Sequence, residues 1–178
     1  MTISPNAFGA LFDDFQWEAF RLETLDDYSK SGSVDAYQAF LTGKPKPTDY
    51  NARWLAQVQR NIDAGRRMYR VHILTRPLTP YLQFELGWGY QTNATAGEEF
   101  FILDITDRPN PLEGVPDFWM FDESATVSMA YDDEGAFLGA EEESEVEKWI
   151  RWRDAALSHA EPFTDWWARH GINEREHR

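Results

Sequence analysis

The chain has 178 residues, of which 42% are hydrophobic and 15% are aromatic, and its formal net charge is −14. The length fits one folded domain around one core, and the excess of acidic residues argues against direct binding to nucleic acid or to anionic lipid. The sequence contains no cysteine, which excludes disulfides and thiolate zinc sites and is typical of proteins in a reducing cytosol.

The first part of the chain, residues 1–68, is expected to be mainly helical. It lacks the basic and apolar regions of a secretory signal, and no apolar run in the sequence approaches the roughly 20 residues that cross a bilayer, so we expect a cytoplasmic protein without a membrane span. Ser4-Pro5 predicts a helix start, because serine caps free N–H groups and proline fits the first turn. A strand is expected at residues 20–24, with Arg21 and Glu23 on the same face.

Residues 69–140 are expected to form the core of a sheet. The β-rich run at residues 69–75 contains Arg70 and His72. Residues 77–96 suit one long helix that is entered through Thr79-Pro80 and carries Tyr81 and Glu85.

The chain then returns to strands and ends in helices. Strands are predicted at residues 98–104 and 117–122, and residues 125–140 predict a hairpin around an Asp-Glu-Gly turn. Residues 141–170 are expected to form C-terminal helices. Because adjacent Trp166 and Trp167 point about 100° apart on a helix, we expect one of them to be exposed. The simpler interpretation is a tail that folds across the sheet; the sharper one makes Trp166 and Trp167 an aromatic anchor for a protein partner.

The common catalytic motifs are missing. The sequence has neither a glycine-rich phosphate loop nor a Gly-x-Ser-x-Gly elbow, and none of its four histidines form pairs three or four residues apart. The acidic runs at residues 132–134 and 141–145 do not match a calcium loop. We therefore predict no catalytic residue, no metal site and no cofactor, and we interpret His72 as a structural imidazole.

Seven short motifs are spread along nearly the whole chain. They are Phe20-Arg-Leu-Glu23, Ala64-Gly-Arg66, Arg70-Val-His-Ile-Leu74, Pro77 to Tyr81, Ala96-Gly-Glu98, Asp117-Phe-Trp-Met-Phe-Asp122 and Trp152-Arg-Asp-Ala-Ala156. Together they resemble an uncharacterised actinobacterial family, known only as a domain of unknown function. Members are often encoded beside helix-turn-helix regulators, and the resemblance implies a small cytoplasmic protein in that setting.

A second, more limited resemblance is to the phospholipase D-like module. In that module a strand, a helix, a glycine and a strand precede a His-x-Lys-x4-Asp strand and a hairpin, which is the order of residues 69–131. If Asp122 matches the final aspartate, the histidine position holds Val115 and the lysine position holds Asp117. The resemblance therefore implies a non-catalytic half module with an N-terminal helical elaboration, because neither side chain can serve the phosphodiester chemistry.

These observations predict an α/β (α+β) fold in which residues 1–178 form one domain with a mixed central sheet flanked by helices. The function that we favour is a non-enzymatic regulatory or adaptor protein that binds another protein, such as a helix-turn-helix transcription regulator.

The alternative is a small-ligand sensor or an enzyme with a polar pocket at the sheet edge. Arginine–carboxylate pairs in such a pocket could orient a charged ligand, although the same pairs could be purely structural. The candidate pocket residues are Arg21, Glu23, Arg70, Tyr81, Glu85, Asp122 and Arg153.

Overall fold

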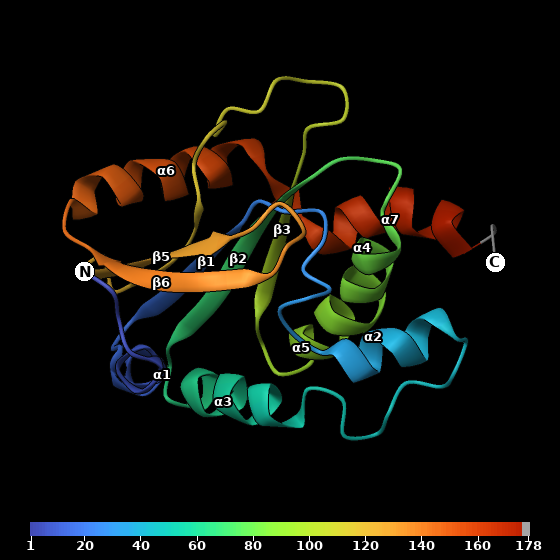
Figure 1. Ribbon diagram of the computed structural model, residues 1–178, viewed down its shortest axis with the longest axis horizontal. Coiled ribbons are helices and arrows are strands. Elements are labelled where there is room, and N and C mark those ends of the chain that lie inside the picture. Colours follow the sequence, from blue (N-terminus) through green and yellow to red (C-terminus); the bar gives the residue numbers. More distant parts are fainter. Residues whose placement is uncertain (176–178) are drawn as a thin grey trace.

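A computed structural model describes residues 1–175 of the chain, with the side chains of residues 1–171. The predicted α/β class is confirmed, since a seven-stranded mixed sheet lies between layers of helices (Figure 1). The strands are β1 (Glu18–Glu23), β2 (Arg67–Leu74), β3 (Glu99–Asp104), β4 (Asp117–Phe121), β5 (Ala125–Tyr131), β6 (Phe137–Glu143) and β7 (Glu161–Pro162). The helices are α1 (Pro5–Asp14), α2 (Val34–Leu41), α3 (Ala52–Asp63), α4 (Pro80–Phe84), the π-helical turn η1 (Glu85–Tyr90), α5 (Gln91–Ala94), α6 (Val146–His159) and α7 (Phe163–Arg175).

The strands lie in the order β6-β5-β4-β1-β2-β3-β7. The first three strands of the chain are parallel, whereas β4, β5 and β6 continue the sheet as an antiparallel meander on the other side of β1. The strand β1 therefore lies in the middle of the sheet, flanked by parallel β2 and antiparallel β4.

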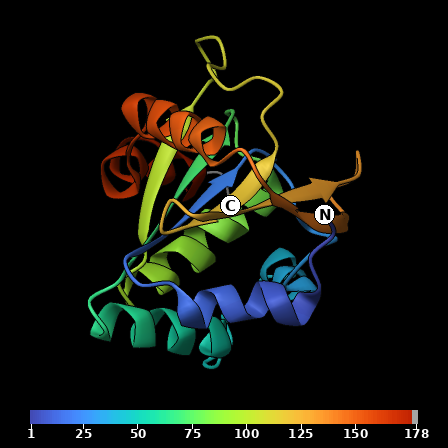
Figure 2. The ribbon, with the colours of Figure 1, turned by 90° about the vertical axis from the view of Figure 1, so that its left-hand side faces the viewer.

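The two faces of the sheet differ in character because side chains alternate along each strand. One face is apolar: Phe20, Leu22 and Val71 pack with Trp149 and Ala156 of α6. The other face is covered by α1, α3 and the segment from α4 to α5, which lie on the side of the sheet opposite α6 (Figure 2). Polar and charged side chains gather on this second face.

The predicted helix starts are confirmed by their capping bonds. The Ser4 hydroxyl accepts a hydrogen bond of 3.1 Å from the Ala7 N–H at the start of α1. The Thr79 hydroxyl accepts one of 3.1 Å from the Leu82 N–H at the start of α4. Each capping residue is followed by a proline in the first turn of the helix. Proline lacks an N–H, and at this position an N–H would have no acceptor within the helix.

The helix predicted over residues 77–96 is only partly correct. Helical structure begins at Pro80, and the turn from Glu85 to Tyr90 is π-helical rather than α-helical. Gly87 and Gly89 lie in this turn, and glycine disfavours the α-helix by about 1 kcal/mol relative to alanine, which lowers the cost of leaving it.

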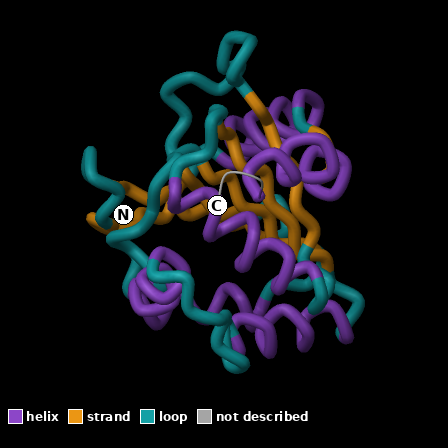
Figure 3. The backbone as a smooth tube through the Cα atoms, turned by 90° about the vertical axis from the view of Figure 1, so that its right-hand side faces the viewer, coloured by secondary structure: helices purple, strands orange, loops and turns teal. Residues whose placement is uncertain are grey.

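The ends of the sheet show two features that the sequence pattern does not predict. The short strand β7 adds to β3 between α6 and α7. Residues 105–116 form a long loop before β4 (Figure 3), and Leu112 and Val115 of this loop are buried in the same apolar cluster as Trp149 of α6. Among the described residues, no helix combines the length and the apolar character that a membrane span requires.

The prediction that Trp166 anchors a partner is wrong for the free chain, because this side chain is 0% exposed. Its indole Nε1 donates a 3.0 Å hydrogen bond to Asp104, and its ring lies in an apolar cluster with Leu82 and Phe100. Trp167 is half-buried, with its ring centroid 5.5 Å from that of Phe163. The tail folds across the sheet, as the simpler interpretation predicts.

Candidate ligand-binding pocket

A cavity of about 280 Å³ lies between the polar face of the sheet and the helices that cover it. Its walls include eight aromatic side chains: Tyr28, Tyr50, Trp54, Tyr81, Phe84, Tyr90, Trp119 and Tyr131. Arg21, Glu23, Arg70 and Glu85 also line it. Residues 31–33 are exposed lining residues, so they mark the mouth of the cavity.

The register of the parallel strands explains why the charged groups meet. Arg21 of β1 pairs with Arg70 of β2, and Glu23 pairs with His72 one alternation further along. All four side chains therefore project from the same face, side by side across two central strands. On the other side of β1, Trp119 of β4 pairs with Arg21 and faces the same cavity.

The guanidinium group of Arg70 is held between two carboxylates. Its Nη1 donates a 2.6 Å hydrogen bond to Glu23 Oε1, and its Nε donates one of 2.8 Å to Glu98 Oε1. The Nη2 group also donates to Glu98. Glu98 is buried and accepts a further 2.8 Å bond from the indole N–H of Trp54, so both of its oxygens are engaged.

The guanidinium group of Arg21 shares Glu23 with Arg70, since its Nε lies 3.9 Å from Glu23 Oε1, and it has further partners of its own. Its Nη2 lies 3.2 Å from Asp117 Oδ2, and the same nitrogen donates to the Tyr131 hydroxyl at 3.2 Å. Asp117 is itself fixed by the Tyr28 hydroxyl at 2.6 Å and by the Thr24 backbone N–H at 3.0 Å. Burial raises the pKa of Asp117 above its ordinary value, although Arg21 opposes that effect.

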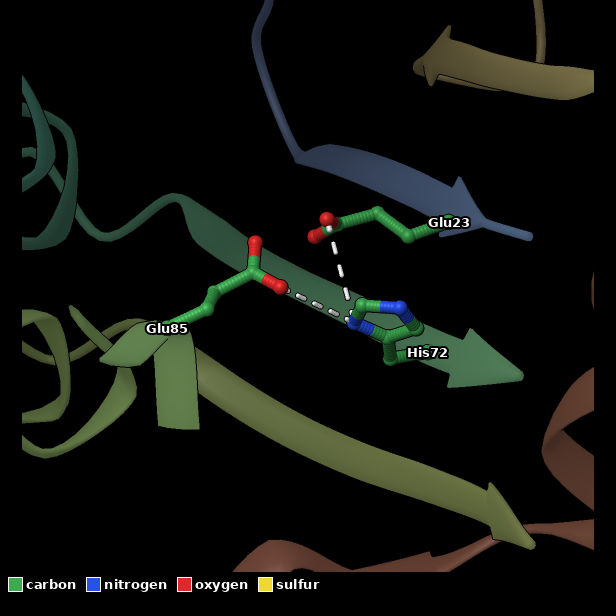
Figure 4. A group of neighbouring side chains, drawn as sticks. All are labelled: Glu23, His72 and Glu85. Carbon is green, nitrogen blue, oxygen red and sulfur yellow. Dashed lines mark ion pairs between the residues drawn. The ribbon is translucent and has the colours of Figure 1, made fainter. Parts of the chain in front are cut away.

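Glu23, His72 and Glu85 converge beside these ion pairs from β1, β2 and η1 (Figure 4). His72 Nδ1 lies 3.4 Å from Glu85 Oε2 and 3.9 Å from Glu23 Oε2. The other ring nitrogen, Nε2, lies 2.7 Å from the Leu25 carbonyl oxygen. One oxygen or nitrogen from each of the three residues falls within 4.8 Å of the others, and these are the donor types that bind metal ions.

The pKa values of the two glutamates of this group shift in opposite directions. Burial and the neighbouring charge of Glu23 raise the pKa of Glu85 well above its ordinary value. Burial also acts to raise the pKa of Glu23, but attraction to Arg70 outweighs it and leaves that pKa below its ordinary value. Burial raises the pKa of the Tyr28, Tyr81 and Tyr90 hydroxyls, so these groups are protonated at neutral pH.

The π turn explains how two residues of one helical segment both reach the cavity. Glu85 and Tyr90 are five residues apart, and in an α-helix they would point about 140° apart around the axis. Hydrogen bonding from residue i to i+5 brings such residues to nearly the same side. Both side chains line the cavity.

Five of the seven pocket residues expected from the sequence line this cavity: Arg21, Glu23, Arg70, Tyr81 and Glu85. They lie on central strands and on the covering helix, so the expected position at the sheet edge is wrong. The parallel pairing of β1 with β2 is the reason, since it places Arg21 and Arg70 in the middle of the sheet.

Asp122 and Arg153 lie outside the residues that line the cavity. Asp122 accepts hydrogen bonds of 2.6 Å and 2.7 Å from the backbone N–H groups of Gln16 and Trp17, and it therefore fixes the turn before β1. Arg153 of α6 pairs with Glu18 and Glu123, and α6 packs on the apolar face of the sheet. Asp122 therefore makes hydrogen bonds to the backbone and Arg153 makes ion pairs, and neither residue lines the pocket.

Sequence reasoning missed Glu98, Asp117 and the grouping of His72 with two glutamates. Glu98 precedes β3, and its role depends on Arg70, which lies 28 positions earlier in the chain. The one signal available for His72 was its alternation with Arg70 on a β-rich run, which places both side chains on one face.

A family model described as a domain of unknown function (DUF6879) matches residues 6–168. The match covers most of the chain, and the chain therefore belongs to this family. No curated protein shows significant similarity to it.

Proposed function

We propose that this member of the DUF6879 family binds a small, ring-shaped molecule in the aromatic cavity, as a ligand sensor or an enzyme. The observation that supports the proposal most strongly is the convergence of aromatic walls with Glu85, Tyr81 and Tyr50 on one cavity. Ligand sites typically combine apolar and aromatic walls with a few convergent polar groups, often with perturbed pKa values.

The size of the cavity limits the ligand. A volume of about 280 Å³ is just below the roughly 300–1,000 Å³ of typical sites for drug-sized molecules. The ligand is therefore compact, of the size of one or two fused rings with small substituents. Flat rings suit the walls, because aromatic side chains favour stacked and edge-to-face contacts.

The charges at the cavity also limit the ligand. Among the described lining residues, the guanidinium groups of Arg21 and Arg70 are each already paired with carboxylates. A phosphate or carboxylate ligand would have to compete with those carboxylates. The groups left to contact a ligand are Glu85, the Tyr50 and Tyr81 hydroxyls, and the amide donors and acceptors of Asn51 and Asn93 that their mutual 3.1 Å hydrogen bond does not use. These groups favour an uncharged ring that carries N–H donors and ring acceptors at its edge.

A thermal-unfolding screen against heterocyclic metabolites tests this proposal. A ligand present at 100 times its Kd adds about 2.7 kcal/mol of stability. Gly32→Trp should abolish the response by filling the mouth; a Cβ at Gly32 meets no heavy atom within 4 Å, so the fold should tolerate the change. The matched control is Gly9→Trp on α1, where a Cβ also meets open space. A library without a single responding compound, or a response that survives Gly32→Trp, would argue against the pocket.

A second candidate function is the regulatory or adaptor role in which the protein binds another protein. The observation that favours it is the exposure of Trp17, whose residue surface is 71% accessible, since tryptophan is enriched at interface hot spots. The identity of the partner remains a prediction. We expect a helix-turn-helix regulator whose gene lies beside the gene for this chain in an actinobacterium, and we expect the two proteins to meet in the cytoplasm. Titration of that regulator against the chain and against Trp17→Ala would test it, and equal or undetectable binding by both would contradict it.

The resemblance to the phospholipase D-like module also remains a prediction, in its non-catalytic form. It is supported by Asp117, which lies where the module has a phosphate-binding lysine and which pairs with Arg21 here. We expect no hydrolysis of bis(p-nitrophenyl) phosphate by the purified chain above the buffer rate. Turnover that is lost in Asp117→Asn would contradict this reading.

A further inference from the structure

The imidazole of His72 is oriented as in a metal ligand. A carbonyl oxygen can only accept a hydrogen bond, so the 2.7 Å contact with Leu25 places a proton on Nε2. In the neutral ring the lone pair is then on Nδ1, which is the nitrogen that faces Glu23 and Glu85 (Figure 4). A second ring nitrogen that donates to a backbone carbonyl is the usual outer-shell contact of a metal-bound histidine.

Glu85 supplies an oxygen that lacks a hydrogen-bond partner in the part of the chain that the structure describes. Its Oε2 is buried and accepts no hydrogen bond among the described residues. This oxygen lies 3.4 Å from His72 Nδ1, close enough for one ion to bind both atoms. An unsatisfied buried polar atom in a native structure calls for a missing partner, such as an ion.

The charges of the surrounding network leave room for a divalent cation. Arg21 and Arg70 contribute two positive charges, whereas Glu23, Glu98, Asp117 and Glu85 offer four carboxylates. Two negative charges remain once the ion has displaced the proton of Glu85 and all four carboxylates are ionised. One divalent ion would neutralise them.

The distances also suit a metal ion. Bonds of about 2.1 Å at tetrahedral angles place neighbouring ligand atoms about 3.4 Å apart. The separation of His72 Nδ1 from Glu85 Oε2 is 3.4 Å, and its separation from Glu23 Oε2 is 3.9 Å. Without the ion, the Tyr90 hydroxyl donates a 2.8 Å hydrogen bond to His72 Nδ1. It can donate to Glu23 Oε1 instead, 3.2 Å away, and so leave Nδ1 free to bind the ion.

We propose that Glu23, His72 and Glu85 form a site for one divalent transition-metal ion, with its remaining coordination position directed at the cavity. Mixed imidazole and carboxylate ligands favour Zn²⁺ and its first-row neighbours over Mg²⁺, which prefers oxygen ligands and retains its water. Glu23 and Glu85 line the cavity, so an ion between them would contact a ligand or a water molecule there. Occupancy of the site does not depend on the ring-shaped ligand proposed above.

The test is calorimetric titration of Zn²⁺ into chelator-treated protein, with Mg²⁺ as the comparison ion. We expect one Zn²⁺ per chain and a raised Tm, with no response to Mg²⁺ at equal concentration. Glu85→Gln should weaken Zn²⁺ binding by more than about 100-fold, beyond the 10–100-fold loss typical of outer-shell changes. This variant should fold as well as the parent, because the lost carboxylate oxygen has no partner in the metal-free chain.

The control is Glu113→Gln, an exposed carboxylate on the loop between β3 and β4, which should bind Zn²⁺ as the parent does. Absence of Zn²⁺ binding by the parent, equal binding by Glu85→Gln, or an equal loss in Glu113→Gln would each overturn the proposal. If Glu85→Gln fails to fold, the imidazole nitrogen resonances of His72 in the parent decide instead. A shift of the Nδ1 resonance on Zn²⁺ addition supports the site, and an unchanged resonance overturns it.

Discussion

Replacing Arg70 with methionine should cost this protein much of its stability. The change leaves Glu23 and Glu98 buried without the cation that pairs with both. Removing one partner of a buried ion pair typically costs about 3–5 kcal/mol, because the remaining charge is uncompensated. The total stability of a domain is only about 5–15 kcal/mol, so the variant should unfold at a much lower urea concentration.

The chain contains a matched control three residues away. Arg67 of β2 pairs with Glu99 on the neighbouring strand, as Arg70 pairs with Glu98, but its side chain is 43% exposed. Exposed ion pairs contribute about 0–1 kcal/mol, so Arg67→Met should change stability by no more than that. The comparison therefore isolates the effect of burial from that of pairing.

Urea unfolding, followed by tryptophan fluorescence and circular dichroism, measures both variants. Adding Glu98→Gln to Arg70→Met should restore more than about 1 kcal/mol, because it removes one of the two stranded charges. The reasoning is refuted if Arg70→Met loses less than about 1 kcal/mol, or if Arg67→Met proves equally damaging.

Three further predictions concern other parts of the fold. Trp166→Ala should lower the free energy of unfolding in urea by about 3–5 kcal/mol, whereas Trp17→Ala should change it by less than about 0.5 kcal/mol. Burial acts to raise the pKa of Asp104, but hydrogen bonds from a threonine and from Trp166 outweigh it and lower the pKa to about 2. The stability that Asp104 provides is therefore present above about pH 4 and is lost as the pH falls towards 2, and an unfolding series across that range should be flatter for Asp104→Asn. Gly97→Ala should lower the Tm, because Gly97 has φ +102° and a methyl group would lie 2.9 Å from a side-chain carbon of α3; Gly9→Ala, with open space in α1, should raise it.

Much of the fold follows from patterns that are local in the sequence. Alternation in Phe20-Arg-Leu-Glu23 predicts β1 and the shared face of Arg21 and Glu23, and both are found. The caps at Ser4 and Thr79 locate two helix starts, because the cap hydroxyl and the following proline act within one turn.

The composition of the pocket could be predicted only in part, because its contacts join distant parts of the chain. Arg21 and Arg70 are 49 positions apart, and only the parallel register of β1 with β2 brings them together. Sequence patterns do not determine which strands become neighbours. For the same reason Asp122, which looked like a pocket residue, is engaged by backbone N–H groups more than 100 positions earlier in the chain.

The error at Trp166 has a different origin. The expectation assumed that one helix face meets one flat surface, so that two adjacent tryptophans could not both be covered. Trp166 instead inserts into a cluster formed by α4, η1 and β3, with Asp104 satisfying its indole N–H. A polar partner for a buried tryptophan cannot be inferred from helical periodicity.

The π turn explains how one extra residue is accommodated without loss of the site. At the present length a regular α-helix would place Glu85 and Tyr90 about 140° apart, whereas both side chains line the cavity with the π turn in place. Deleting Gly87 would leave the two residues four positions apart, which is about 40° on a regular α-helix, so they would still share a side. A relative shorter by one residue at this point would therefore present the same two side chains from an ordinary helix. The spacing of this glutamate and tyrosine, read together with the type of helical turn, is thus the marker of shared chemistry among relatives.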